Sequence, residues 1–401
     1  MDGKKSVAVF FGAKSFEHDV SILTGLEVCA SLACTQYDVF PVYVDLYNQL
    51  WTGSALLSKT IYPLQEWGKK MLLKTQLLIG KKKPTLLVEE QGLFFKSKKE
   101  INFDVAFCAF HGDYGENGYM QGLFEVAGIP YTGCRMFSAG TCMNKSLSKM
   151  LAKQVGVNVL PEIVLNKPQT DFFDIDELTK DIKDFPVIVK PIALGSSVGV
   201  SKANNRSELN ISVIQVFKLG DDALIEPFVE NLEEYNISVT KALNGKTTAS
   251  TIERPIKKGA EFLGFTEKYM NGGSKKGGVK GSKLNNTSGS MINMTRVFEP
   301  PELTKEDVNK LKEWAVKIFD KLDCNGVVRI DFMCNSKTRE LYFNEINTIP
   351  GSLAYYLWEA SDPSYSHVEL AKFLVKEALE LDKNKMGDII LEQSKIFKTN
   401  L

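Results

Sequence analysis

The amino-acid sequence predicts an α/β protein whose N-terminal domain is an open, largely parallel sheet, with further strands and helices in the rest of the chain. Two observations predict this class. Apolar strand-like runs alternate with helical patterns through the first third of the chain. The 401 residues are enough for two or three domains of about 150 residues each.

The N-terminal third is expected to hold strands at residues 7–11, 39–44 and 103–110, with helices at 19–33 and around Leu123 to Ala127. Ligands gather at the carboxyl ends of strands in such sheets, and Glu17 and His111 fall there. Residues 45–100 are interpreted as an elaboration of this domain, and the lysines at 81–83 as a solvated loop.

The remaining elements follow the same patterns. We expect a helix over 138–155 that ends at Gly156, strands at 163–165, 187–189 and 223–226, and a hairpin returning through 198–202. A strand at 237–241 precedes a helix over 304–322, whose start has capping-box spacing at Thr304 and Asp307. Two more strands and a helix at 368–381 close the fold. The predicted units are 1–135, 136–226 and 227–385, with a polar tail at 386–401.

Composition narrows the functional class. Lys and Arg together number 49, as do Asp and Glu, so no long-range field draws the chain to nucleic acid or an anionic membrane. No apolar run approaches the span of a bilayer, and the N-terminus lacks a signal-peptide pattern. The seven cysteines are odd in number and contain no Cys-x-x-Cys pair. These features predict a cytoplasmic protein in a reducing compartment.

A phosphate-binding turn is predicted after the strand at 187–189. Lys190 ends that strand, and Gly195-Ser-Ser-Val-Gly199 follows as a small-residue turn. Backbone N–H groups of such a turn can hold phosphates, although an ordinary hairpin is the alternative when the turn is taken alone. Charged residues on two later strands favour nucleotide binding over an ordinary hairpin.

Those residues lie on two strands near the C-terminus. Alternate residues of a strand share a face, so Arg329 points with Asp331, and Glu345 with Asn347. A simple hairpin register sets Asp331 opposite Glu345 and Arg329 opposite Asn347. Such oxygen ligands suit Mg²⁺, and Arg329 could stabilise a transferring phosphoryl group. The alternative is a solvent-facing polar side of the hairpin.

Seven motifs together resemble the D-alanine:D-alanine ligases of the ATP-grasp superfamily. The resemblance covers residues 5 to about 380. The motifs, in order, are Glu17-His-Asp-Val-Ser21, His111-Gly-Asp-Tyr-Gly-Glu-Asn-Gly118, Met143-Asn-Lys145, Val-Lys190-Pro with Gly195-Ser-Ser-Val-Gly199, Lys268-Tyr269, Arg329-x-Asp331-Phe and Glu345-Ile-Asn347-Thr-Ile-Pro-Gly351.

The resemblance implies two ATP-grasp subdomains of the α+β class after the N-terminal domain, and a role for each matching residue. Catalytic roles fall to Glu17, Ser196, Tyr269 and Arg329, with Ser196 linking Glu17 to Tyr269 and Glu17 holding the first amino acid near His111. Nucleotide-binding roles fall to Lys145, Lys190, Ser196, Ser197, Glu226, Val229, Glu234 and Lys268. Asp331, Glu345 and Asn347 are implied to hold two Mg²⁺ ions, with Mn²⁺ as an alternative.

The implied activity joins two D-alanine molecules through a D-alanyl phosphate, at the expense of ATP, for peptidoglycan precursor synthesis. Small molecules are the implied partners, without nucleic acid or membrane, and a homodimer is compatible with the family. Three alternatives stay open: a different acceptor such as D-serine, D-lactate or another small amino acid, a non-catalytic nucleotide-binding regulator, and a kinase-like phosphotransferase.

The chain departs from the family pattern in three places. Ser352 and Leu353, which would bind the second amino acid, follow Gly351 directly instead of after an intervening Met-Thr. Asn144 replaces the usual Asp of the Met-Asp-Lys motif. The Gly- and Lys-rich residues 271–290 are either a lid over the site or an insertion without a catalytic role.

Overall fold

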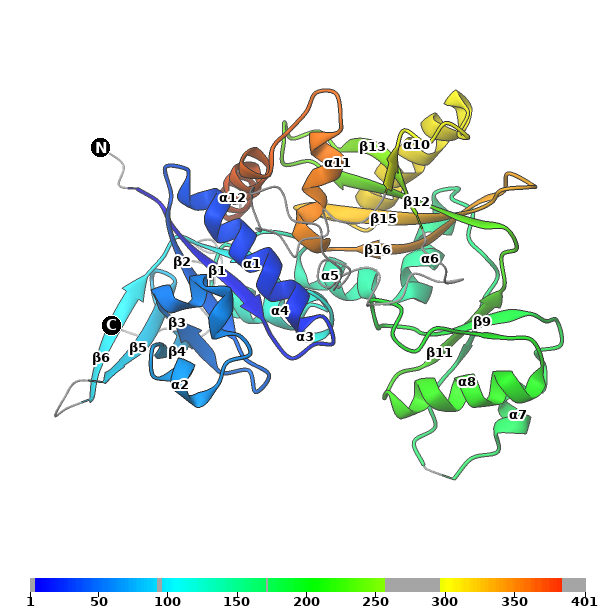
Figure 1. Ribbon diagram of the computed structural model, residues 1–401, viewed down its shortest axis with the longest axis horizontal. Coiled ribbons are helices and arrows are strands. Elements are labelled where there is room, and N and C mark those ends of the chain that lie inside the picture. The colour runs from blue at the N-terminus through cyan, green and yellow to red at the C-terminus, as the bar shows by residue number, and fades with distance from the viewer. Residues whose placement is uncertain (1–3, 92–95, 171, 257–295, 384–401) are drawn as a thin grey trace, which may run out of the picture.

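Three β-sheets and their covering helices form the structure in Figure 1, a computed structural model that describes residues 4–91, 96–170, 172–256 and 296–383. The predictions for Lys268, Tyr269, the 271–290 segment and the tail at 386–401 fall outside these residues. No helix among the described residues is long and apolar enough to cross a membrane.

The N-terminal sheet has seven strands in the order β6-β5-β4-β3-β2-β1-β7. Only β1 pairs in parallel, with β2 on one side and β7 on the other, and all other pairings are antiparallel. The strands are β1 (Ser6–Gly12), β2 (Asp38–Val44), β3 (Leu50–Thr52), β4 (Leu73–Leu78), β5 (Thr85–Gln91), β6 (Lys96–Asn102) and β7 (Val105–Cys108).

The strands expected at 7–11, 39–44 and 103–110 pair in parallel, but residues 45–100, interpreted as an elaboration of the domain, make the sheet as a whole mostly antiparallel. Residues 45–49 join β2 to β3, and residues 79–84 join β4 to β5. Both connections are too short for the crossover of a dozen or more residues that parallel pairing requires. These residues instead extend the sheet with four antiparallel strands.

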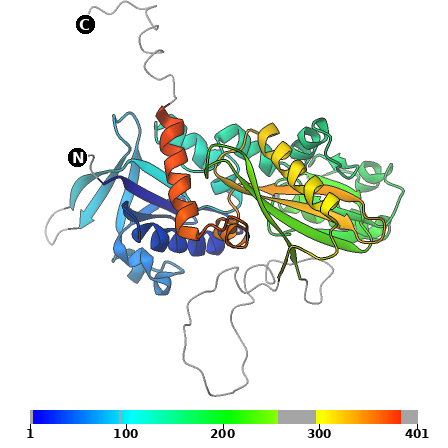
Figure 2. The same ribbon diagram turned by 90° about the horizontal axis from the view of Figure 1, so that it is seen from above.

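The helix α1 (His18–Ala33) packs on this sheet through Gly25. A Cβ atom at Gly25 would lie 2.4 Å from Cγ of Phe11 on β1, so only glycine allows this close approach. The C-terminal helix α12 (His367–Lys383) lies beside α1, as Figure 2 shows, and buries Leu370 and Leu374 in the same core. The two ends of the chain thus share one hydrophobic core.

The other two sheets confirm the predicted hairpins. In the four-stranded sheet, order β10-β9-β11-β8, Ser201 pairs with Val189 across the β9/β10 hairpin. In the five-stranded sheet, order β14-β13-β12-β15-β16, Asp331 pairs with Glu345 and Arg329 with Asn347, as predicted. The strands are β8 (Ile163–Leu165), β9 (Val187–Pro191), β10 (Ser201–Ala203), β11 (Ala223–Pro227), β12 (Leu232–Thr240), β13 (Thr248–Pro255), β14 (Arg296–Phe298), β15 (Val327–Asn335) and β16 (Leu341–Asn347).

Helices cover these sheets and connect them (Figure 1). The capping box at Thr304 is confirmed, because its hydroxyl accepts from the Asp307 N–H and the Asp307 carboxylate accepts from the Thr304 N–H. The remaining helices are α2 (Glu66–Lys69), α3 (Asp113–Glu116), α4 (Tyr119–Val126), α5 (Met136–Met143), α6 (Lys145–Gln154), α7 (Ile175–Thr179), α8 (Arg206–Lys218), α10 (Lys305–Lys321) and α11 (Tyr355–Glu359), with short 3₁₀ turns η1 (Ser54–Leu57), η2 (Lys59–Ile61) and η4 (Gly351–Ala354).

The single helix predicted over 138–155 is wrong. Asn144 has extended backbone angles and separates α5 from α6, and its side chain accepts a hydrogen bond of 2.9 Å from the Leu147 N–H. An asparagine can separate two helices in this way, because its side-chain oxygen accepts from a backbone N–H that has no partner within the first turn of the second helix. The break places Lys145 at the first position of α6.

We predict that Asn144→Ala destabilises the protein by about 1 kcal/mol, because the N-cap hydrogen bond of α6 is lost. Asn144→Asp retains a hydrogen-bond acceptor, so its free energy of unfolding should lie within about 0.5 kcal/mol of the native value. The measurement is the urea midpoint followed by circular dichroism. Equal midpoints for Asn144→Ala and the native chain would show that the cap contributes nothing.

Candidate nucleotide and substrate site

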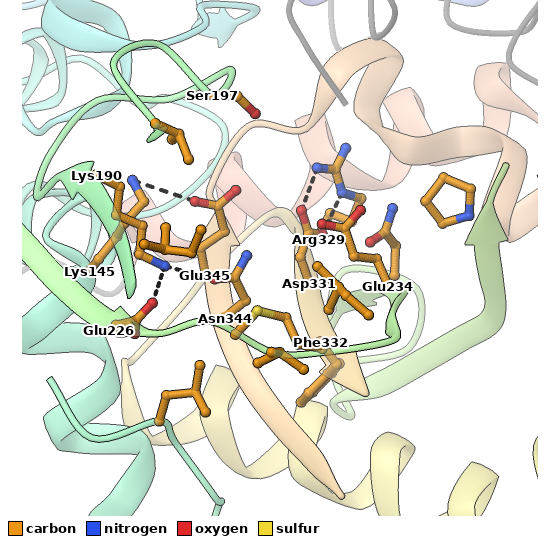
Figure 3. Close-up of a pocket in the computed structure, with 18 of the residues that line it drawn as sticks. Lys145, Lys190, Ser197, Glu226, Glu234, Arg329, Asp331, Phe332, Asn344 and Glu345 are labelled. Carbon is orange, nitrogen blue, oxygen red and sulfur yellow. Dashed lines mark hydrogen bonds and ion pairs between the residues drawn. The ribbon is translucent and has the colours of Figure 1, made fainter. Parts of the chain in front are cut away.

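A pocket lies between the four-stranded and five-stranded sheets (Figure 3). Its walls come from β9 and β11 on one side and from β12, β15 and β16 on the other. Nine of the predicted site residues line it: Lys145, Lys190, Ser197, Glu226, Val229, Glu234, Arg329, Asp331 and Glu345. The structure thus brings together residues that are far apart in the sequence, such as Lys145 and Glu345, which are 200 positions apart.

The acidic face of the pocket is built on the β15/β16 hairpin. Arg329 donates from Nε and Nη2 to the two carboxylate oxygens of Asp331, with both distances 2.7 Å. Asn347 donates from Nδ2 to Oδ2 of Asp331 at 3.3 Å. Arg329 and Asp331 are both buried, so their paired charges are screened little by solvent.

The hairpin offers two carboxylates and one amide oxygen to a cation. Within the described ranges, no group of three or more His, Cys, Asp and Glu side chains is placed to hold a metal. The third donor here is an amide, Asn347, so such a group is not required. Mg²⁺ commonly takes one or two carboxylates and completes its shell with water and phosphate oxygens. The donor set therefore fits Mg²⁺ bound together with a nucleotide.

Two lysines face this hairpin from the opposite wall. Lys145 donates from Nζ to the Leu194 carbonyl at 2.6 Å and lies 3.4 Å from Glu345. Lys190 lies 2.6 Å from Oε2 of Glu226 and donates to Oδ1 of Asn344 at 3.1 Å. Burial, reinforced by the nearby Lys145 ammonium, lowers the pKa of Lys190 to about 8.

The predicted phosphate-binding turn adopts unusual backbone angles. Ser196 and Ser197 have φ of 52° and 59°, in the left-handed region that non-glycine residues rarely occupy. A Cβ atom at Gly195 would lie 2.8 Å from Oε2 of Glu17, so glycine is required beside that carboxylate. Strained turns of this kind persist where the surroundings hold them, and they cluster at functional sites.

A second cluster joins the N-terminal domain to this turn. The Ser196 hydroxyl donates to Oε1 of Glu17, which confirms that these two predicted residues meet. His111 contacts Oγ1 of Thr24 through Nε2 at 2.8 Å, and burial lowers the pKa of His111 to about 3. His111 is therefore neutral at physiological pH. It lies next to Gly112, whose Cβ position would be 2.7 Å from Oε2 of Glu17.

The predicted acceptor residues form a strained turn. Ser352, Leu353 and Ala354 have φ of 49°, 56° and 49°, so three consecutive non-glycine residues are left-handed. Each costs roughly 1–2 kcal/mol relative to ordinary helical angles. The Ser352 N–H donates to Oγ1 of Thr24 on α1 at 3.2 Å. The helix α1 thus helps to hold this turn in place.

Sequence reasoning missed several residues of these clusters. Glu116 lies inside a quoted motif, and it accepts from the N–H groups of Gly112 and Ile349 at 2.9 Å each. Burial, with a contribution from the Glu17 carboxylate, raises the pKa of Glu116 to about 7. Lys149 follows Lys145 by one helical turn, a spacing that places both on one face and could have identified it.

Two further missed residues, Glu253 and Arg296, carry no local signal. Glu253 is buried on β13 and accepts from the Tyr356 hydroxyl at 3.1 Å, and Arg296 stacks 3.7 Å above the Tyr356 ring. Both line the pocket. Only strand pairing across β13 and β14 brings them there, so no spacing in the sequence could have revealed them.

Comparisons with known proteins agree with this architecture. A family model described as the D-ala D-ala ligase N-terminus matches residues 6–134, and one described as the D-ala D-ala ligase C-terminus matches residues 151–368. The chain is 33% identical to a D-alanine--D-alanine ligase of Thermosipho melanesiensis, over 94% of this chain and 97% of the relative. It is 31% identical to one of Thermosipho africanus, over 98% of each chain.

Solved structures show the same fold. The D-alanine-D-alanine ligase from Coxiella burnetii superposes with a TM-score of 0.74 at 22% identity, covering 98% of this chain and 99% of that one. The VanG D-Ala:D-Ser ligase from Enterococcus faecalis gives a TM-score of 0.72 at 22% identity, covering 94% and 99%. With both halves of the chain matched by family models and full-length relatives above 30% identity, this protein belongs to the D-alanine–D-alanine ligase family and has its ATP-grasp fold.

Proposed function

We propose that this protein joins two D-alanine molecules in an ATP- and Mg²⁺-dependent reaction that releases ADP and phosphate. The observation that carries the proposal is the pocket itself, in which Lys145 and Lys190 face the Arg329, Asp331 and Glu345 side chains across two sheets. Cations on one wall and oxygen ligands on the other suit a triphosphate with its metal. The product is a precursor for peptidoglycan.

The first half of the reaction makes an acyl phosphate. Glu17, held by Ser196, binds the ammonium of the first D-alanine, so that its carboxylate faces the γ-phosphate. A carboxylate oxygen attacks the γ-phosphorus, and the bond to the bridging oxygen of ADP breaks. Lys145, Lys190 and Arg329 offset the charge that develops on the phosphoryl oxygens. Mg²⁺ held by Asp331, Glu345 and Asn347 would add further positive charge at those oxygens.

The second half forms the amide bond. The neutral amine of a second D-alanine attacks the acyl carbon, phosphate leaves, and the amine loses a proton. Ser352 and Leu353 are proposed to position this acceptor, and their turn lies against α1 near Thr24. Lys268 and Tyr269 are proposed to close over the nucleotide and the first amino acid, as the family resemblance implies. Closure would keep water from the acyl phosphate.

The remaining pocket residues are assigned to the nucleoside. Val229 and Glu234 follow β11 and line the pocket, which suits contacts to adenine and ribose. The Glu226 carboxylate is only 2% exposed and is paired with lysines, so this residue contributes to adenine binding through its main chain. A cytoplasmic location is proposed because ATP is the co-substrate and all seven cysteines are free thiols.

We also propose that the chain divides into three units near residues 135 and 226. Each sheet falls almost wholly within one of them, since the seven-stranded sheet ends at Cys108 and the five-stranded one begins at Leu232. The helices α5, α6 and α12 tie the units together, because they pack on sheets of neighbouring units.

The direct test supplies ATP, Mg²⁺ and D-alanine as the only amino acid. We expect stoichiometric ADP, phosphate and D-alanyl-D-alanine, measured by a coupled assay and by mass spectrometry. Phosphate release that begins only after another D-amino or D-hydroxy acid is added would contradict D-alanine as the acceptor. A stable phosphorylated product would indicate a kinase instead.

A different acceptor is a second candidate, favoured by the turn at 352–354. The Ser-Leu pair follows Gly351 directly, and three left-handed residues place it against α1. A site of altered shape can admit a different second substrate while the first half-reaction is unchanged. Competition between D-alanine and D-serine, read as the ratio of the two dipeptides, distinguishes the candidates.

Arg329→Met should lower kcat by about 100-fold or more, because it removes a charge aimed at the transferring phosphoryl group. The matched control is Arg339→Met, which removes an arginine from the far end of the same hairpin, where it pairs with Asp307 at 2.6 Å. That control should keep kcat within about twofold of the native value, since Arg339 does not line the pocket. Equal losses in both variants would assign the effect to folding.

The pH dependence of kcat/KM for ATP should follow the protonation state of Lys190. Below its pKa of about 8 this side chain is cationic and attracts phosphate, whereas above that pH it loses its proton. We therefore expect kcat/KM for ATP to fall above pH 8 by up to about tenfold per pH unit. Lys190→Arg keeps its charge and should remove this fall. A fall of the same steepness in Lys190→Arg would assign it to another group.

A further inference from the structure

Lys149 is a buried lysine that no motif of the sequence singled out. It lies on α6 one turn after Lys145, its side chain is 1% exposed, and it lies behind the pocket wall without lining the pocket. A lysine is rarely buried to this extent unless it is paired, because the charge loses its hydration. Its partners therefore indicate its role.

Two carboxylates meet the Lys149 ammonium. It forms an ion pair with Oε1 of Glu226, and its Nζ lies 3.8 Å from Oε2 of Glu162. Glu162 is held in turn, since its Oε1 accepts from the Ser146 hydroxyl at 2.5 Å. The other oxygen of Glu226 lies 2.6 Å from Lys190. Glu226 is therefore shared between one lysine that lines the pocket and one that does not.

This sharing has an electrostatic consequence for the pocket. A buried carboxylate 2.6 Å from Lys190 would by itself cancel most of the positive charge that this lysine presents to a phosphate. Lys149 supplies the compensating cation on the far side of Glu226. Burial and the Lys190 ammonium lower the pKa of Lys149 well below its usual range, but the pair with Glu226 has zero net charge whichever group holds the proton.

We propose that Lys149 is a positioning residue for nucleotide phosphates: by balancing Glu226 it leaves the charge of Lys190 free to act on the pocket. The inference rests on the proposed nucleotide site and deepens it. Lys149 does not touch the substrate. It acts through Glu226, which also fixes where the Lys190 ammonium stands relative to Asn344 and the β15/β16 hairpin.

A purely structural ion pair makes a different prediction. It would lower stability when broken, and it would leave the affinity of the folded protein for ATP unchanged. Charge balance instead predicts that ATP affinity falls when Lys149 is neutralised and returns when Glu226 is neutralised as well. The double variant separates the two explanations, because it lacks the ion pair but restores the net charge near Lys190.

The experiment compares Lys149→Met, the double variant Lys149→Met with Glu226→Gln, and Lys153→Met. Lys153 lies on the same helix and is exposed, which makes it a matched control for loss of a lysine from α6. ATP binding is measured by calorimetry with Mg²⁺ and without an amino acid. This readout needs no turnover, so it stays valid if the ligase assignment fails. KM for D-alanine is measured separately.

We expect Lys149→Met to weaken ATP binding roughly 30-fold or more, since it leaves a buried carboxylate beside Lys190. The double variant should recover most of that loss, Lys153→Met should match the native chain, and KM for D-alanine should change less than threefold in all of them. The proposal is overturned if folded Lys149→Met binds ATP within threefold of the native chain. It is also overturned if the Kd of the double variant for ATP is more than ten times the native value. This second criterion can be applied even where Lys149→Met fails to fold.

Discussion

The pairing of buried lysines with buried carboxylates is the constraint on which the site depends. Lys145, Lys149 and Lys190 are all buried between two sheets, and such like charges could not be desolvated together without opposite charges beside them. Glu226 and Glu345 supply those charges from the two sheets that form the pocket. Lys145 and Lys190, which are proposed to bind phosphates, therefore also help to hold the two walls of the pocket in their relative positions.

Hydrogen bonds join the N-terminal domain to the elements around this pocket. Ser196 reaches Glu17 from the phosphate turn, and Glu116 accepts from the backbone of the loop that follows β16. Both links end on residues close to the β15/β16 hairpin or the turn at 195–199. A substrate held at Glu17, as proposed, would therefore be positioned by the same elements as the nucleotide, which is what an in-line transfer to a carboxylate requires.

Two runs of consecutive left-handed non-glycine residues lie where the substrates are proposed to bind. Ser196 and Ser197 at the phosphate turn, and the left-handed turn from Ser352 to Ala354, lie at two sides of the same region. Buried hydrogen bonds to Thr24 on α1 and to Glu17 just before α1 hold these conformations. Ser352 and Leu353 follow Gly351 without the Met-Thr of the family pattern, so we propose acceptor choice as the property in which this protein can differ from that pattern.

Local patterns determined much of this molecule. Strand alternation puts Arg329 on the same face as Asp331. The short connection between the two strands favours the register in which Asp331 pairs with Glu345. Both features depend only on residues close together in the sequence. Tertiary structure decided the rest. Asn144 divides a segment that periodicity predicts as one helix, and short connections turn residues 45–100 into antiparallel strands. The role of Lys149 could not be read locally, since a lysine acquires a buried partner only when packing removes water from both of them.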